Sequence, residues 1–282
     1  MTPTMTSLTD VRSETIIRPR PGWISIDWRE LWDSRELLAF LVWRDVSVRY
    51  KQTVLGLAWA ILQPVFTMLV FTVVFGNLAQ MPSQGVPYPI FVYAGLLPWM
   101  FLSTAVTGAS QSLVSQQALL TKIYLPRLFV PAASIGGGLV DLLVSSGVFA
   151  LLMAYYGVVP GWGLLAVPLL VLLTLVASLG VGLALAALTV TYRDFRYVIP
   201  FMVQAWMYLS PVIYPVTLVP PKWQLLLAVN PMVGIIDGFR SALLGTPWNL
   251  PALAMSTACA SALLLFGLFY FRKTERRFAD VA

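Results

Sequence analysis

The sequence contains no histidine and only one cysteine, Cys259. Metal sites built on imidazole, histidine general bases and disulfides within the chain are therefore excluded. Charge is also scarce: charged residues make up 11% of the chain, whereas 59% is hydrophobic and the mean hydropathy is +0.80. Because an ordinary soluble domain carries about 25% charged residues, this composition indicates a membrane protein.

The charges are missing over long stretches. None occurs from Gln52 to Thr121, and Asp141 is the only one between Leu128 and Tyr192. A bilayer core of about 30 Å is crossed by about 20 apolar residues, so each stretch holds two spans and a turn. Two shorter uncharged runs add one span each. We predict an all-α integral membrane protein with six spans, at Gly56 to Phe75, Ile90 to Val114, Leu128 to Tyr156, Leu164 to Thr191, Tyr197 to Ile213 and Leu250 to Phe271.

The positions of the basic residues predict the orientation. With the N-terminus in the cytoplasm, 16 of the 18 Lys and Arg residues fall on the cytoplasmic side, and only Lys222 and Arg240 fall on the other. Cytoplasmic loops are enriched in Lys and Arg. We therefore expect a multi-pass protein of a bacterial inner membrane with both termini in the cytoplasm. The net charge of +6 then needs no nucleic-acid partner.

The distribution of polar and apolar residues divides the chain into four predicted parts. Residues 1–22 read as a disordered cytoplasmic leader and residues 272–282 as a cytoplasmic tail. Residues 23–51 alternate apolar and charged positions at helical spacing, which indicates interfacial amphipathic helices. Residues 52–271 form the six-span domain. Between its last two spans, short apolar runs split by Asn230 and Pro231 favour short re-entrant outer helices.

The segment from Val42 to Pro64, VWRDVSVRYKQTVLGLAWAILQP, resembles the signature of the type-2 ABC permeases that export O-antigen, capsular polysaccharide or teichoic acid. Tyr192 to Arg196, Ser210 to Pro215 and Asn230 to Met232 are similar to later motifs of that family in the same order. The resemblance covers about Glu36 to the end of the chain.

This resemblance implies a homodimer bound to two copies of a separate ATPase, which binds ATP and magnesium while this chain binds no cofactor. The chain itself has no phosphate-binding loop of the GxxxxGK[ST] type. The implied substrate is a glycan on a polyprenyl diphosphate, which passes through a channel between the two permease copies, with membrane lipid around them. The family's ATPase contacts correspond to Arg44, Asp45, Arg49, Lys122, Tyr124 and Arg127, and its outer gate to Asn230, Pro231, Asp237 and Arg240.

Two stripes of aromatic and amide side chains could line such a channel. They lie at helical spacing in the first and fifth spans, and lipid-facing glutamines would lack partners. Aromatic faces stack on sugars and amides bond hydroxyls, which suits an uncharged or mildly charged glycan. The alternative is packing against neighbouring helices or lipid. The stripes are Trp59, Gln63 and Phe66, preceded by Gln52, and Tyr197, Phe201, Gln204 and Tyr208.

Several charges carry two interpretations each. Asp141 lies near the middle of the third span, where a charge is costly. It is either a contact to a partner helix or a proton site, or a protonated or hydrogen-bonded group packed near Ser145. Arg44, Arg49 and Lys51 form a charge cluster that contacts anionic lipid. Alternatively, as the resemblance implies, Arg44, Asp45 and Arg49 contact the ATPase or guide the carrier's diphosphate. Asp237 and Arg240 form either a local ion pair or part of a gate.

Two other functions stay open. An exporter of small amphiphilic drugs or lipids would share the helices but should lack a continuous aromatic channel. A membrane-embedded glycosyltransferase would need clustered acids or metal ligands, and the outer segment offers only Asp237.

Overall fold

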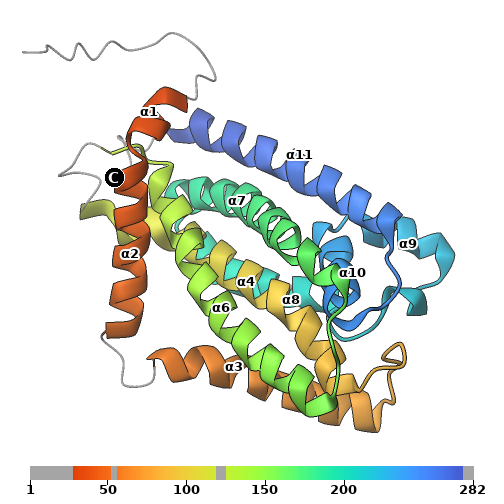
Figure 1. Ribbon diagram of the computed structural model, residues 1–282. Helices are drawn as coiled ribbons and strands as arrows, with labels where there is room; N and C mark the ends of the chain where they lie inside the picture. The colour runs from red at the N-terminus through yellow and green to blue at the C-terminus, as the bar shows by residue number, and fades with distance from the viewer. Residues whose placement is uncertain (1–27, 52–55, 119–124, 276–282) are drawn as a thin grey trace, which may run out of the picture.

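The computed structural model describes residues 28–51, 56–118 and 125–275, and all regular structure in these ranges is helical (Figure 1). The predicted leader, the loop containing Lys122 and Tyr124, Gln52 and most of the predicted tail lie outside the described residues.

Five helical stretches in the described ranges are long and apolar enough to cross a membrane. They coincide with the first four predicted spans and the last. The stretches are α3 (Gly56–Phe71) continued by the π-helix η1 (Thr72–Leu78), α4 (Tyr88–Ser115), α6 (Phe129–Tyr156), η2 with α7 (Trp162–Ala166 and Val167–Thr191) and α11 (Leu250–Glu275). A sixth crossing exists only if two bent helices near residue 230 count as one span.

The predicted fifth span is shorter than expected. Helix α8 covers Phe195–Tyr208, and 14 residues at 1.5 Å each extend about 21 Å, less than a bilayer core of about 30 Å. The prediction that this helix continues to Ile213 is wrong because Pro211 removes a backbone donor and restricts Ser210. After the exposed Leu209, the chain continues as a largely buried irregular segment, residues 210–215, which packs near the start of α4.

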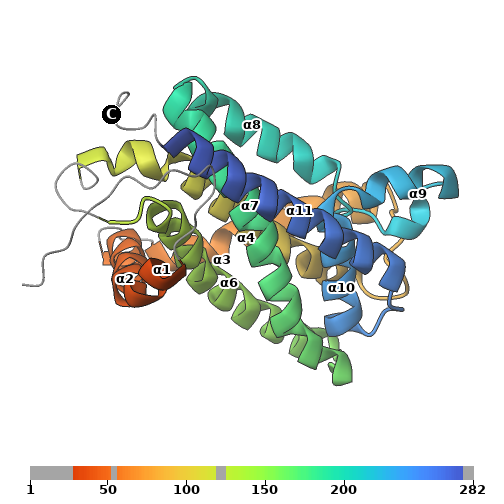
Figure 2. The ribbon, with the colours of Figure 1, turned by 90° about the horizontal axis from the view of Figure 1, so that it is seen from above.

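Helix α4 lies at the centre of the bundle, in contact with α3, α6, α7, α8 and α10. Figure 2 shows α8 at the rim, away from this centre. Small residues allow the closest crossings of the helices. A Cβ on Gly136 would lie 2.9 Å from Val42 of α2, and a Cβ on Gly267 of α11 would overlap the carbonyl oxygen of Gly180 in α7.

Most basic residues of the described chain lie at one end of the bundle, whereas Lys222 and Arg240 belong to helices at the other end. Arg127, just before α6, donates from Nη1 to the Glu275 carbonyl at the end of α11, 2.7 Å away. The short helix α1 (Trp28–Asp33) and helix α2 (Arg35–Lys51) lie at the same end. In Figure 2, α2 is seen nearly along its axis while α7 and α11 run across the view, so α2 lies across this end of the bundle.

The opposite end is capped by η3 (Val216–Leu218), α9 (Pro221–Ala228) and α10 (Pro231–Leu244). The axes of α9 and α10 differ by 97°. Every residue of α10 up to Leu243 is buried, because the helix packs against α4, α7 and α11. Helix α10 is therefore part of the core of this end.

Candidate functional site

A cavity of about 490 Å³ lies between α3 and α8, with α4 beneath it. Four of the seven residues predicted to line a channel border it: Gln63, Phe66, Gln204 and Tyr208. Helix α4 adds hydroxyl groups, which belong to Ser103, Thr104 and Thr107. Two stripes far apart in the sequence thus face one hollow, which we call the α3–α8 groove.

Helical spacing explains why these side chains share the groove. In α8 the buried residues Ile199 and Val203 form one face, and the predicted stripe forms another. The other three residues predicted to line a channel lie outside the α3–α8 groove. Trp59 borders a neighbouring cavity, whereas Tyr197 and Phe201 border neither and are 70% and 72% exposed in the single chain. The structure therefore brings together part of the predicted lining.

The neighbouring cavity, of about 430 Å³, lies on the other side of α3, between α3, α4 and α6. We call it the α3–α6 cavity. Its border includes Gln63, Met100 and Thr104, which also border the α3–α8 groove. The two hollows therefore adjoin beneath α3.

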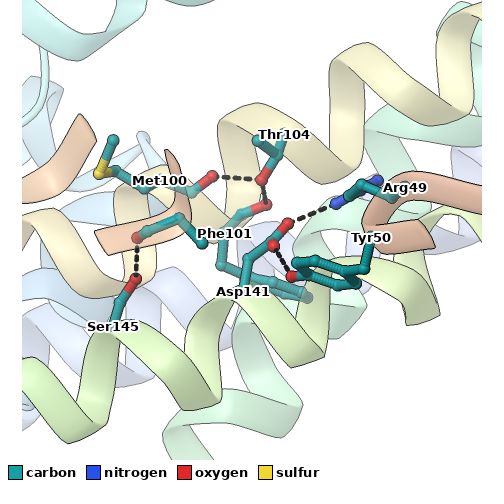
Figure 3. A network of polar contacts seen from close by, with 8 residues as sticks. Arg49, Tyr50, Met100, Phe101, Thr104, Asp141 and Ser145 are labelled. Atoms are coloured by element: carbon teal, nitrogen blue, oxygen red, sulfur yellow. Dashed lines mark hydrogen bonds and ion pairs between the residues drawn. The ribbon is translucent and has the colours of Figure 1, made fainter. Parts of the chain in front are cut away.

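An ion pair at the end of α2 borders the α3–α6 cavity (Figure 3). One oxygen of the Asp141 carboxylate accepts a hydrogen bond from Nη1 of Arg49, and the other accepts one from the Tyr50 hydroxyl. Burial and this hydrogen bond raise the pKa of the Tyr50 phenol, so Tyr50 remains a proton donor. Asp141 is the thirteenth of the 28 residues of α6, so α2 meets α6 near its middle.

This ion pair settles part of the question that Asp141 raises. Asp141 is hydrogen-bonded, as one interpretation expected, but its partners come from α2 of the same chain. Ser145 instead directs its hydroxyl to the carbonyl of Ala60 in α3, 3.4 Å away. Sequence reasoning missed the pairing, although Asp141 is the only charge between Leu128 and Tyr192 and Arg49 ends a helix predicted to point into the bilayer.

A second polar cluster lies nearer the N-terminus of α2. Arg44 donates from Nη2 to Asp45, 2.7 Å away, and to the side-chain oxygen of Gln116 at 2.6 Å, which follows α4. With Arg127, these residues occupy the basic end of the bundle. Of the residues predicted to contact an ATPase, Lys122 and Tyr124 lie outside the described residues. Arg49 differs from the others because it faces the α3–α6 cavity.

The predicted gate residues Asp237 and Arg240 are both buried in α10. The expected local ion pair between them is not formed among the described residues. The guanidinium of Arg240 instead donates to three main-chain carbonyls, at 2.7 Å to Val212 and 3.3 Å to Phe91 and Tyr214. It also lies 3.6 Å from the centre of the Phe91 ring. Arg240 therefore ties α10 to α4 and to the segment after α8.

Asn230 and Pro231 begin α10. The Asn230 side-chain oxygen accepts from the backbone N–H of Met232 and from the Trp206 indole of α8, each at 3.0 Å. Asn230 is thus the N-cap, and Pro231 occupies the first helical position, where no backbone donor is needed. The Asn230 amide also donates to Ser210, 2.9 Å away. These two residues join the end of α8 to α10.

An all-helical bundle with five or six apolar spans and a polar groove on one face defines a multi-pass membrane protein. Residues 36–244 match the ABC-2 type transporter family, and the chain belongs to this family.

Relatives with names include the O-antigen export system permease protein RfbA of Myxococcus xanthus, 32% identical over 216 residues, which are 76% of this chain and 82% of the relative. The protein of the same name in Klebsiella pneumoniae is 23% identical over 252 residues, 87% of this chain and 95% of the relative. The polysialic acid transport protein KpsM of Escherichia coli is 24% identical over 240 residues, 82% of this chain and 91% of the relative.

Proposed function

We propose that this chain is the permease subunit of an ATP-driven exporter that moves a polyprenyl-linked, O-antigen-like polysaccharide from the cytoplasm across the inner membrane. The family match and the names of the relatives support a polysaccharide exporter. The observation that carries the proposal to this chain is the α3–α8 groove, where aromatic rings and amides from two helices face one hollow.

The chemistry of the groove suits a sliding sugar polymer. Phe66 and Tyr208 offer ring faces for sugar stacking, and Gln63 and Gln204 offer amides for hydroxyl groups. No charged residue borders the groove among the described residues. A polymer that slides needs contacts that are weak and repeated. Such a lining favours an uncharged or mildly charged glycan.

The groove is open on one side, which supports a homodimer. Gln63 and Gln204 are exposed in the single chain, and amides that faced lipid would lack hydrogen-bond partners. A second copy facing the groove would close it into a channel. In this arrangement Trp59, Tyr197 and Phe201 extend the lining beyond the cavity.

The remaining roles follow from the two ends of the bundle. The basic end faces the cytoplasm, with both termini there, and α1 and α2 lie in the membrane interface with Trp32, Phe40 and Trp43 exposed. Two copies of a separate ATPase, which hold ATP and magnesium, bind near Arg44, Asp45, Arg127 and the Lys122–Tyr124 loop. At the outer end, α9 and α10 form the re-entrant gate helices.

A deletion strain tests the function. We expect lipid-linked glycan to accumulate inside the cell and to be lost from the surface, with rescue by the wild-type gene. Rescue by a Gln63→Leu and Gln204→Leu double variant should fail, because both groove amides are lost. Unchanged surface glycan together with altered drug sensitivity would favour an exporter of small amphiphiles, and glycosyl transfer by the purified chain alone would favour an enzyme.

A further inference from the structure

The α3–α6 cavity has a different setting from the α3–α8 groove. It lies on the opposite side of α3, beneath the end of α2, and it holds the only charged groups that border either hollow in the described chain. These are Arg49 and Asp141, which pair with each other (Figure 3). A route for an uncharged glycan does not need an ion pair beside it. The pairing of Arg49 with Asp141 therefore needs a separate explanation.

We propose that the α3–α6 cavity binds the phosphate headgroup of a membrane lipid, with Arg49 as the anion ligand and the Asp141 carboxylate in its place when the cavity is empty. The inference rests on the proposed function in one respect: if the chain exports a polyprenyl-linked glycan, the lipid bound in this cavity is the polyprenyl diphosphate carrier.

The shape and lining of the cavity support a lipid. Its volume of about 430 Å³ is enclosed largely by apolar side chains, including Leu97, Phe101 and Leu142, which suit the first part of a hydrocarbon chain. The polar part of its border includes Arg49 and the Gln63 amide, which can both donate hydrogen bonds. An amphiphilic cavity of this kind matches a molecule with a polar head and an apolar tail.

The chemistry of Arg49 supports a phosphate. A guanidinium offers several N–H donors in a plane, and carboxylate and phosphate oxygens accept them in the same geometry. The Arg49 side chain is 38% exposed beside a largely apolar cavity, so an empty site favours an internal anion for its charge. Asp141 supplies it, and the Tyr50 hydroxyl holds the second carboxylate oxygen in position. The cavity also adjoins the α3–α8 groove beneath α3, and Gln63 borders both. A headgroup site in the cavity would therefore lie next to the glycan route.

Competition between Asp141 and the phosphate predicts effects of opposite sign. Arg49→Gln removes the ligand and should weaken lipid binding. Asp141→Asn removes the competing charge while it keeps the side-chain shape, and should strengthen binding. If the ion pair only fastens α2 to α6, the two substitutions act alike, because each breaks the same pair.

The test uses the full chain in nanodiscs of zwitterionic phosphatidylcholine, with radiolabelled undecaprenyl diphosphate as the probe. We expect Arg49→Gln to lower the affinity about tenfold and Asp141→Asn to raise it about tenfold, the size of one charge-assisted hydrogen bond. Arg272→Gln and Glu275→Gln are matched controls, because they break an ion pair on α11 that does not border the cavity. Both controls should leave the affinity unchanged.

Unlabelled competitors identify the source of the phosphate. Displacement by undecaprenyl diphosphate but not by phosphatidylglycerol assigns the site to the carrier, and equal displacement by both assigns it to anionic lipids in general. Displacement by free inorganic diphosphate at the same concentration overturns a lipid site. Shifts of the same sign in Arg49→Gln and Asp141→Asn, or no shift in either, also overturn the proposal. If the Arg49→Gln protein does not accumulate, the comparison of Asp141→Asn with Glu275→Gln decides between a headgroup site and a purely structural ion pair.

The outcomes of the lipid-binding test and the export test are independent of each other. Unchanged glycan in the deletion strain would end the polysaccharide function, but the opposite shifts could still be measured with phosphatidylglycerol as the probe. Conversely, intracellular accumulation of glycan in the deletion strain with no shift in either cavity variant would leave the export function intact and remove only the headgroup site.

Discussion

Helices α3 and α4 are neighbours in sequence and in space, yet their surroundings differ strongly. The most apolar window of α4 is 78% buried within the chain, whereas that of α3 with η1 is 17% buried. The exposed helix is nevertheless the more apolar of the two. In a membrane the outside is as apolar as the inside, so hydropathy identifies a span but does not say which spans form the core.

The content of small and polar residues distinguishes α4 from α3 better than hydropathy does. Helix α4 buries Gly95, Ala105, Ala109, Ser110 and Ser112, which allow close contact with its neighbours. Helix α3 instead exposes Trp59, Leu62 and Phe66. The chain thus has a packed half, built on α4, α7, α10 and α11, and an open half, built on α3 and α8. We place the scaffold in the first half and the glycan route in the second.

The largest expected effect is the loss of the packed half in Arg240→Ala. This change leaves three buried carbonyls without their donor and removes the nearby charge from buried Asp237. A buried polar group that loses its hydrogen-bond partner costs about 1–3 kcal/mol. We expect little folded protein, measured by size-exclusion chromatography of a fluorescent fusion in detergent. Lys222→Ala, on the exposed surface of α9, is the control, and equal yields of the two variants would contradict the prediction.

The second effect is also on the packed half. In Gly267→Leu the new side chain meets the backbone of Gly180, which has no side chain to move, so α7 and α11 must separate. Overpacking of this kind costs about 1–3 kcal/mol. Thermal unfolding in detergent should show a lower midpoint. Gly147→Leu is matched to it, since a Cβ at Gly147 of α6 meets no atom within 4 Å, and an equal loss in that variant would show that the crossing is not responsible.

The packed half shows how much the sequence alone predicts. Uncharged runs locate three of its helices, α4, α7 and α11, because this signal is local. The partners of Arg240 could not be predicted from its neighbour Asp237, because they are main-chain carbonyls brought together by the fold. In the open half, spacing along α3 and α8 predicted stripes that share a groove, but not the pairing of Arg49 with Asp141, which lies 92 residues away.

A third effect should appear in function with little change in folding. We predict that Arg49→Ala abolishes export while the protein stays in the membrane, because Arg49 borders the α3–α6 cavity and is not part of the packed half. The measurement is surface glycan, with the membrane fraction quantified by immunoblot. Arg35→Ala removes a charge from the exposed start of the same helix and should export normally. Unimpaired glycan display by Arg49→Ala would contradict the prediction.

The smallest effect is expected from single changes within the groove. Tyr208→Ala removes one ring from the lining but leaves the amides and hydroxyls of α3, α4 and α8. Because a sliding polymer uses many weak contacts, we expect export to fall severalfold while the unfolding midpoint stays within about 2 °C of the wild type, as for a surface change of less than 0.5 kcal/mol. Leu265→Ala, which truncates an exposed side chain of α11 away from both hollows, should change neither quantity. A fall in the midpoint of Tyr208→Ala without a fall in export would place Tyr208 in the packed half and move the boundary between the two halves.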